Sequence, residues 1–164
     1  MSAPEPAFGL RHFRWDVDKT YIRTEFDNLR DLLSAYRQPA EEKENIPGAP
    51  ALLRALLKAP AESRRVTFIS GSPQQMRETL SRKFELDGIE PDEFILKPNL
   101  SNILKLRLRA VKHQVGYKLE SLLNSRVSHA SEFLFGDDSE QDAWIYSVYA
   151  DMLAHRIGVD ELQE

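Results

Sequence analysis

Two aspartates, two residues apart, lie at the end of a short apolar stretch near the start of the chain. Residues 13–17 (FRWDV) predict a buried strand, and Asp16 and Asp18 lie at its end. A buried carboxylate is costly unless a cation or hydrogen bonds compensate it. Asp16 could attack phosphorus as a nucleophile, and Asp18 could protonate the leaving oxygen. The pair therefore indicates phosphoryl transfer, provided that the chain also supplies cations and phosphate-binding groups.

Later segments carry side chains of the kinds that this chemistry needs. Ser70 offers a hydroxyl, and Gly71 beside it allows a phosphoryl oxygen to approach the backbone closely. Lys118 could neutralise Asp16 and bind phosphate as a point charge. Asp16 and Asp137 offer hard oxygen ligands, which suit Mg²⁺.

Each of these motifs alone has a plain structural alternative. The aspartate pair could be a helix cap or a turn, and Ser70 could belong to an ordinary loop before a helix. Lys118 could be a solvated helix residue, and residues 136–142 (GDDSEQD) could be an acidic turn with a helix cap. Their conjunction favours a site, because all four lie at predicted strand ends or at a helix start and follow one order.

Apolar periodicity predicts the elements that must position these side chains. Strands are expected at residues 13–17, 65–70, 93–96, 104–109 and 132–136. Helices are expected at residues 25–36, 50–57, 116–123 and 143–157, with a loop or flap at 38–48. A further helix is expected to begin at Pro73, with Ser72 as its cap and Gln75 completing a capping box. The apolar face of helix 50–57 is expected to contain Leu52, Leu53, Leu56 and Leu57.

The alternation of strands with helices indicates an α/β fold with a mainly parallel sheet, in which ligands bind beyond the carboxyl ends of the strands. A length of 164 residues suits one domain. We expect a disordered lead-in at residues 1–9, the domain at 10–158 and a tail at 159–164. Trp144 and Tyr146 are expected to pack the closing helix.

Composition restricts the class of protein further. The chain has no cysteine, which excludes disulfides, thiolate metal sites and a cysteine nucleophile, and fits a reducing compartment. No apolar run is long enough to span a bilayer, and the N-terminus does not read as a signal peptide, so a cytoplasmic location is expected. The net charge of −4 argues against a nucleic-acid partner.

The order of the motifs carries a resemblance to a known family. DVDKT, FISGS, YKLESL with Lys118, and FGDDSEQD look like the four motifs of the haloacid dehalogenase superfamily of phosphohydrolases. DVDKTYI, FISGSP and GDDSEQDAWIY narrow the match. They resemble the phosphatidate phosphatase catalytic-domain family of the actin-patch-associated type, with Asp137, Asp142 and Tyr146 at matching spacings. The resemblance implies a Rossmann-like, doubly wound core and Mg²⁺-dependent phosphomonoester hydrolysis through an aspartyl phosphate.

The resemblance also implies a role for each matching residue. Asp16 becomes the nucleophile and Asp18 the general acid/base. The Mg²⁺ ligands become Asp16, the Asp18 carbonyl and Asp137, while Ser70, Gly71 and Lys118 bind phosphate. Asp142 would orient the lysine or a metal-bound water. Thr20 and Asp138 are expected next to Asp142, where they would support the catalytic residues or the metal-bound water. Three positions depart from the family pattern and bear on the substrate, namely Lys19, Asp138 and Ala143.

The segments between the motifs bear on the substrate. The interval between the first and second motifs and the interval between the second motif and Lys118 both look too short for a full lid, so a minimal cap or none is expected. An open site suits a bulky phosphate ester such as phosphatidate or a phosphoprotein. A run of cations without acids could meet an anionic membrane surface peripherally, the alternative being a solvated strand face. This basic group consists of Lys97, Lys105, Arg107, Arg109 and Lys112. Other hypotheses are a phosphatase of a soluble phosphometabolite, a catalytically silent binding module and, least favoured by motif order, a receiver domain. The sequence leaves the oligomeric state open.

Overall fold

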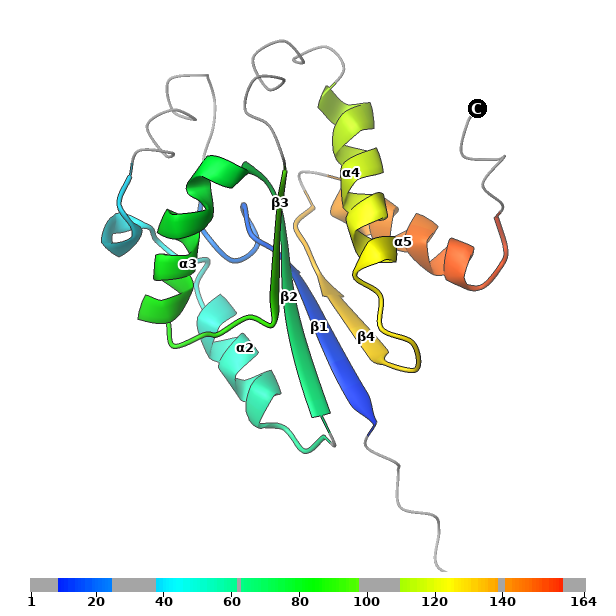
Figure 1. The fold of residues 1–164 in the computed structure, drawn as a ribbon, viewed down its shortest axis with the longest axis horizontal. Coiled ribbons are helices and arrows are strands. Elements are labelled where there is room, and N and C mark those ends of the chain that lie inside the picture. The colour runs from blue at the N-terminus through cyan, green and yellow to red at the C-terminus, as the bar shows by residue number, and fades with distance from the viewer. Residues whose placement is uncertain (1–8, 25–37, 62, 98–109, 139–140, 158–164) are drawn as a thin grey trace, which may run out of the picture.

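The structure is a computed structural model that describes residues 9–24, 38–61, 63–97, 110–138 and 141–157 (Figure 1). Its strands are β1 (Leu10–Asp16), β2 (Ser63–Pro73), β3 (Glu93–Lys97) and β4 (Ser131–Phe135). Its α-helices are α2 (Ala49–Lys58), α3 (Arg77–Leu86), α4 (Ala110–Asn124) and α5 (Asp142–Leu153). Two short 3-10 helices are η1 (Ala40–Glu42) and η2 (Gln74–Met76). None of the described helices is long and apolar enough to cross a membrane.

The described strands form one parallel sheet in the order β3-β2-β1-β4, so all their arrowheads point the same way in Figure 1. β1 lies between β2 and β4, with Asp16 opposite Ile69 and Trp15 opposite Phe135. Parallel neighbours require crossover connections, which the helices supply. The predicted α/β, Rossmann-like doubly wound class is therefore confirmed.

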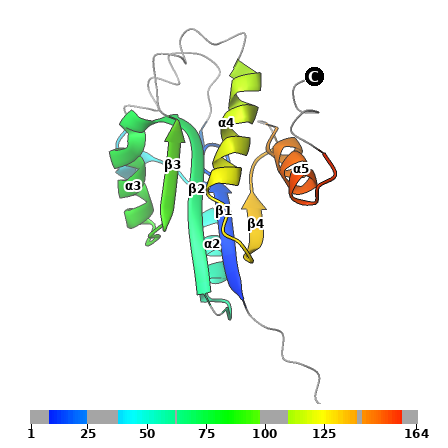
Figure 2. The ribbon, with the colours of Figure 1, turned by 45° about the vertical axis from the view of Figure 1, so that its right-hand side comes forward.

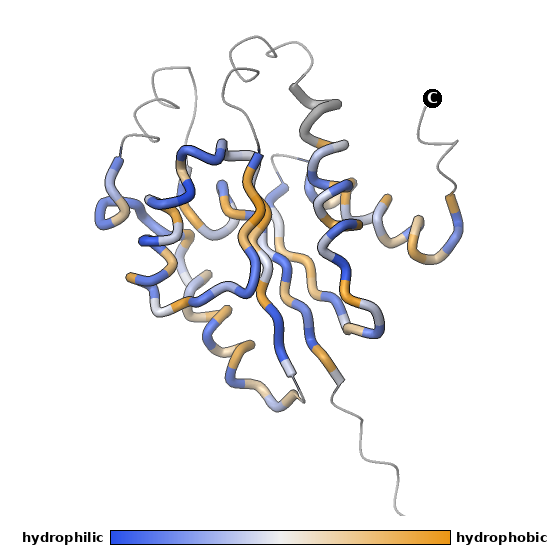
Figure 3. The backbone as a smooth tube through the Cα atoms, in the orientation of Figure 1, coloured by the Kyte–Doolittle hydropathy of each residue, from blue (hydrophilic) through white to orange (hydrophobic). Residues whose placement is uncertain are grey.

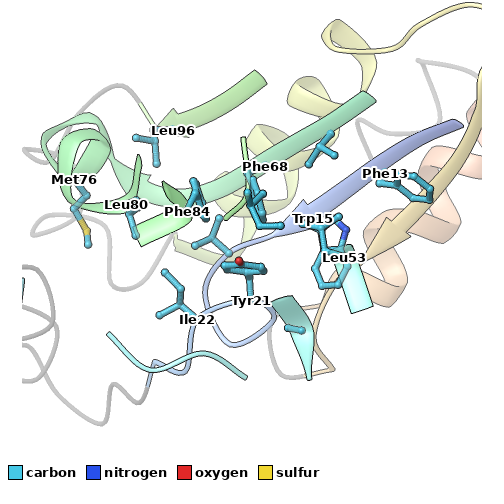
Figure 4. Packing of buried hydrophobic residues seen from close by; sticks show 14 residues of the cluster. Phe13, Trp15, Tyr21, Ile22, Leu53, Phe68, Met76, Leu80, Phe84 and Leu96 are labelled. Carbon is cyan, nitrogen blue, oxygen red and sulfur yellow. The ribbon is translucent and has the colours of Figure 1, made fainter. Parts of the chain in front are cut away.

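Helices cover both faces of the sheet (Figure 2). Side chains of α2 and α3 join one apolar cluster with Phe13, Trp15 and Phe68. Figure 4 shows this cluster, in which the rings of Phe68 and Phe84 stack with centroids 4.1 Å apart. Side chains of α4 and α5 join a second, smaller cluster on the opposite face, around Ile69. This smaller cluster leaves room for polar groups on its side of the sheet.

β1 has two chemically different faces, because successive side chains of a strand point to opposite sides. Phe13 and Trp15 belong to the larger apolar cluster. His12, Arg14 and Asp16 alternate with them and are all buried on the face that α4 and α5 cover. Figure 3 shows the mixture of hydrophilic and hydrophobic segments along the strands. A row of polar side chains inside the fold therefore leads along β1 to its carboxyl end.

Two sequence predictions about helices were wrong in detail. The helix expected to begin at Pro73 starts one residue later, because β2 continues through a bulge to Pro73; the 3-10 helix η2 begins at Gln74 and leads directly into α3 at Arg77. Ser72 makes no capping bond there, because its hydroxyl hydrogen-bonds Asp18. Leu52 does not share the buried face of α2: it is 47% exposed, whereas Leu53 is buried.

The closing helix differs from expectation at one residue. Several other predictions are not tested by the described part of the chain. Trp144 does not pack the closing helix, because it is 55% exposed, whereas Tyr146 packs against the smaller cluster. The predicted helix at 25–36 and strand at 104–109 lie outside the described residues. The lead-in, the tail and the expectation of a minimal cap also stay predictions for this reason.

Candidate active site

The predicted site residues come from separate elements that meet at the carboxyl edge of the sheet. Asp16 is the last residue of β1, Asp137 follows β4, and Asp142 begins α5. Lys118 lies on α4 and places its Nζ 2.7 Å from Asp16 Oδ1 and 2.6 Å from Asp142 Oδ1. All three ion-paired side chains are buried. The fold therefore brings a lysine and two acids, up to 126 residues apart in number, into one ion cluster.

Burial governs the protonation of this cluster. Desolvation raises the pKa of Asp16 well above its ordinary value, and the Lys118 ammonium opposes that rise. Burial likewise raises the pKa of Asp142, again against the effect of Lys118. Burial alone would lower the pKa of Lys118, but Asp16 and Asp142 together raise it above its ordinary range. The lysine is therefore charged at every physiological pH, and its charge favours the ionised form of both acids.

A divalent cation fits the oxygen atoms of this edge. Asp16, Asp137 and Asp142 each offer a carboxylate oxygen, and these atoms lie within 4.8 Å of one another. The described cluster holds three acids around one lysine, an excess of negative charge that a hard cation would offset. Asp142 Oδ2 also accepts a 3.3 Å hydrogen bond from the backbone amide of Asp137, which ties together the two ends of the loop between β4 and α5.

Asp18 directs its carboxylate to two hydroxyls of β2. Its Oδ2 accepts hydrogen bonds from the Ser70 hydroxyl at 2.8 Å and the Ser72 hydroxyl at 3.0 Å. The Ser72 amide in turn donates to Ser70 Oγ at 2.9 Å. Thr20 donates to Asp16 Oδ2 at 3.2 Å. The two aspartates are thus oriented independently, which suits two different chemical roles.

A tight loop after β1 allows the carboxylates of Asp16 and Asp18 to be oriented independently. The amides of Tyr21 and Ile22 both donate to the carbonyl of Val17, so the chain reverses at once. Lys19 at the turn has φ 63, in the left-handed region that non-glycine residues seldom adopt. The next segment closes the loop, because Ile22 bridges both Asp18 and Asn45.

Gly136 is needed where β4 gives way to the acidic loop. A Cβ built at this position would lie 2.6 Å from Asp142 Cβ and 2.8 Å from its Cγ, closer than atoms of this kind approach one another. The glycine therefore lets the buried carboxylate of Asp142 lie directly against the backbone.

Several predicted site residues lie apart from the cluster. Asp138 is exposed, whereas Gly71 is half-buried at the β2 bulge. Lys97 ends β3 with its ammonium 5.8 Å from the centre of the Tyr117 ring, and burial lowers its pKa. Lys105, Arg107, Arg109 and the side chain of Lys112 lie outside the described part of the chain.

Three residues near the site escaped the sequence analysis as candidates. The sequence pattern favours a helix cap at Ser72, although its spacing of two from Ser70 is also typical of a second hydroxyl on the same side of a strand. Lys43 is 5% exposed, and burial lowers its pKa while the charge of Asp18 opposes that effect. Arg14 is 1% exposed two residues before Asp16, a position at which the period of a strand could have indicated a shared face.

Comparison with known proteins supplies the identity that this geometry leaves open. No curated protein matches the chain. The family model described as phosphatidate phosphatase APP1, catalytic domain, matches residues 15–159, which include Asp16, Lys118 and Asp142. The chain therefore belongs to the family of phosphatidate phosphatase APP1 catalytic domains and is a phosphatase of the phosphatidate phosphatase type.

Proposed function

We propose that this phosphatase hydrolyses the phosphomonoester of phosphatidate with Mg²⁺, through an aspartyl phosphate on Asp16. The observation that carries the proposal is the paired arrangement of two differently held aspartates at the sheet edge. Asp16 is buried and ion-paired with Lys118, whereas Asp18 is held by two hydroxyls of β2. A nucleophile and an acid/base need this kind of separation, because each must keep its own protonation and direction.

The first step transfers the phosphoryl group to the protein. An oxygen of Asp16 attacks phosphorus, and the bond between phosphorus and the ester oxygen breaks. The proton of Asp18 goes to the leaving oxygen, which departs as an alcohol. Lys118 balances charge beside Asp16, and Thr20 fixes the other oxygen of the carboxylate.

The second step frees the enzyme. Asp18, now ionised, takes a proton from a water, which attacks phosphorus and breaks its bond to Asp16. Inorganic phosphate leaves, Asp16 is again a carboxylate and Asp18 again carries a proton. A bound Mg²⁺ would neutralise carboxylate and phosphoryl oxygens as they approach each other. Asp16, Asp137 and the Asp18 carbonyl are the proposed ligands, and Asp142 keeps Lys118 in place.

The lipid is the finer part of the proposal. The family to which the chain belongs has phosphatidate phosphatase as its description, which supports a phosphorylated lipid as substrate. The basic group named above (Lys97, Lys105, Arg107, Arg109 and Lys112) would contribute attraction to an anionic bilayer, at roughly 1 kcal/mol for each cation near the surface.

Phosphate release tests the proposal. We would incubate the protein with vesicles containing phosphatidate, and separately with an aryl phosphate, in Mg²⁺ or EDTA. Asp16→Asn is expected to abolish release from both substrates, and EDTA to do the same for the wild type. Asp151→Asn is the matched control, because it removes one carboxylate from the surface ion pair with Arg156. Release from the aryl phosphate alone would reject the lipid, and release by a folded Asp16→Asn variant would reject the nucleophile.

A further inference from the structure

Arg14 is a fully buried cation that the proposed reaction does not use. It lies on β1 two residues before Asp16, on the same face of the strand, and is 1% exposed. A cavity of about 10 Å³ between them is lined by Arg14, Asp16, Lys118 and Tyr146, among others. Arg14 thus lies directly beneath the ion cluster, one step further from the edge of the sheet.

The guanidinium contacts three further elements at once. Its Nη1 donates to the carbonyl of Leu122 on α4 at 2.8 Å and to the hydroxyl of Tyr149 on α5 at 3.0 Å. Its Nη2 lies 3.5 Å from Glu132 Oε1 on β4. Tyr149 donates to the other oxygen of Glu132 at 2.7 Å, which closes the ring of contacts. The fixed planar fork of arginine suits such a three-way contact.

These partners belong to the elements that carry the ion cluster. Leu122 lies one helical turn after Lys118 on α4, and Tyr149 lies about two turns after Asp142 on α5. Glu132 lies on β4, the strand that leads into Asp137. Arg14 shares β1 with Asp16. Each of the four elements that supply a carboxylate or the lysine therefore also supplies one member of the group of contacts around the Arg14 guanidinium.

We propose that Arg14 is the positioning residue of the site: its guanidinium fixes β1, α4, β4 and α5 relative to one another and so sets the Asp16–Lys118–Asp142 geometry. This inference rests on the proposed function for its catalytic consequence. Its geometric part concerns the metal-free protein alone. A shift of Arg14 and its contacts would lengthen the two ion pairs of Lys118. Small misplacements of reacting groups lower the reaction rate strongly.

The test follows the accessibility of Lys118 in the metal-free protein. An amine-acylating reagent is added, and mass spectrometry gives the rates of modification at Lys118 and Lys83. Lys83 is an internal control, because it is also buried and ion-paired, 2.7 Å from Asp87, but lies on α3 across the sheet. Global unfolding accelerates both rates together, whereas a local opening beneath the cluster raises the ratio of Lys118 to Lys83.

The variants remove contacts in graded steps. Tyr149→Phe and Glu132→Gln each alter one of the contacts of Arg14 together with the Tyr149–Glu132 hydrogen bond, and Arg14→Lys keeps the charge but loses the planar guanidinium fork. Arg14→Met removes the guanidinium and is used only if it folds. Ser125→Ala is the matched control, because it removes a buried hydroxyl just after the end of α4 that donates to the backbone carbonyl of Ser121 and makes none of the Arg14 hydrogen bonds given above.

The expected result is a ratio of Lys118 to Lys83 modification at least about fivefold higher in the Arg14, Tyr149 and Glu132 variants, and unchanged in Ser125→Ala. For the aryl phosphate we expect kcat to fall roughly tenfold with KM within about twofold. A ratio within about twofold of the wild type in the folded Arg14→Lys protein would overturn the inference. A wild type that releases no phosphate would refute the proposed function, while the modification ratio would still decide the role of Arg14.

Discussion

His12 gives the sharpest prediction about stability, because its surroundings fix its protonation. Its Nε2 lies 2.8 Å from Thr67 Oγ1, and Arg14 Nε donates to its Nδ1 at 3.4 Å. A guanidinium can only donate, so Nδ1 accepts and Nε2 carries the single proton of a neutral ring. Burial, then the charges of Arg14 and Arg65, lower the pKa of His12 from 6.5 to about 4, against a small opposing effect of Asp92.

The size and sign of the pH effect follow from this shift. The folded pKa lies below the unfolded one, so the unfolded chain takes up a proton first as the pH falls. The contribution of His12 to the free energy of unfolding is thus fully present above pH 6.5 and is lost between pH 6.5 and about 4. At 1.36 kcal/mol for each pKa unit, the loss is roughly 3 kcal/mol.

The assay is urea unfolding of the wild type and of His12→Gln between pH 4 and 7.5. Glutamine does not titrate, and its amide can still donate to Thr67. The carboxylates titrate in both proteins, so their effects cancel in the difference between the two unfolding free energies. We expect the wild type to lose roughly 3 kcal/mol relative to the variant on acidification. A difference that stays constant across this pH range would refute the assignment of a neutral, buried ring.

Three substitutions at the carboxyl edge of the sheet give further predictions. Gly136→Ala should force the Asp142 carboxylate away and destabilise the fold by about 1–3 kcal/mol, measured by urea unfolding, with phosphate release lost as well. Lys118→Met leaves Asp16 and Asp142 buried without their cation, so unfolding at pH 7 should become easier by about 3–5 kcal/mol. That loss should shrink at low pH, where the acids are protonated, and an equal loss at both pH values would contradict it. Ser72→Ala removes one of two hydroxyls on the proposed general acid and should lower kcat roughly tenfold with little change in the melting temperature; an unchanged kcat would contradict this role.

The sequence predicts the framework well, because apolar periodicity reports burial directly. Residues 13–17 predict a buried strand, and β1 lies inside the sheet between β2 and β4. The order of the four motifs predicts which residues meet at the sheet edge, and the structure brings Asp16, Lys118 and Asp142 together.

What the sequence misses depends on tertiary contacts. The residues around Ser72 match the local pattern of a helix start, but the hydroxyl donates its hydrogen bond to Asp18, which lies 54 residues earlier in the chain. Arg14 interrupts an apolar stretch and would ordinarily be placed on a surface. Its hydrogen-bonding partners lie 108 and 135 residues away, so local patterns do not indicate which groups compensate its buried charge.

Asp16 is proposed to carry the phosphoryl group during turnover, which acid-quench mass spectrometry can detect on the protein itself. Wild-type protein turning over phosphatidate with Mg²⁺ is quenched in acid, and its peptides are examined by mass spectrometry. We expect the added mass of one phosphoryl group on the peptide that contains Asp16, removable by hydroxylamine and absent in Asp16→Asn. Phosphate release at the wild-type rate with that peptide unmodified, or with the phosphoryl group on another residue, would show that Asp16 is not the nucleophile.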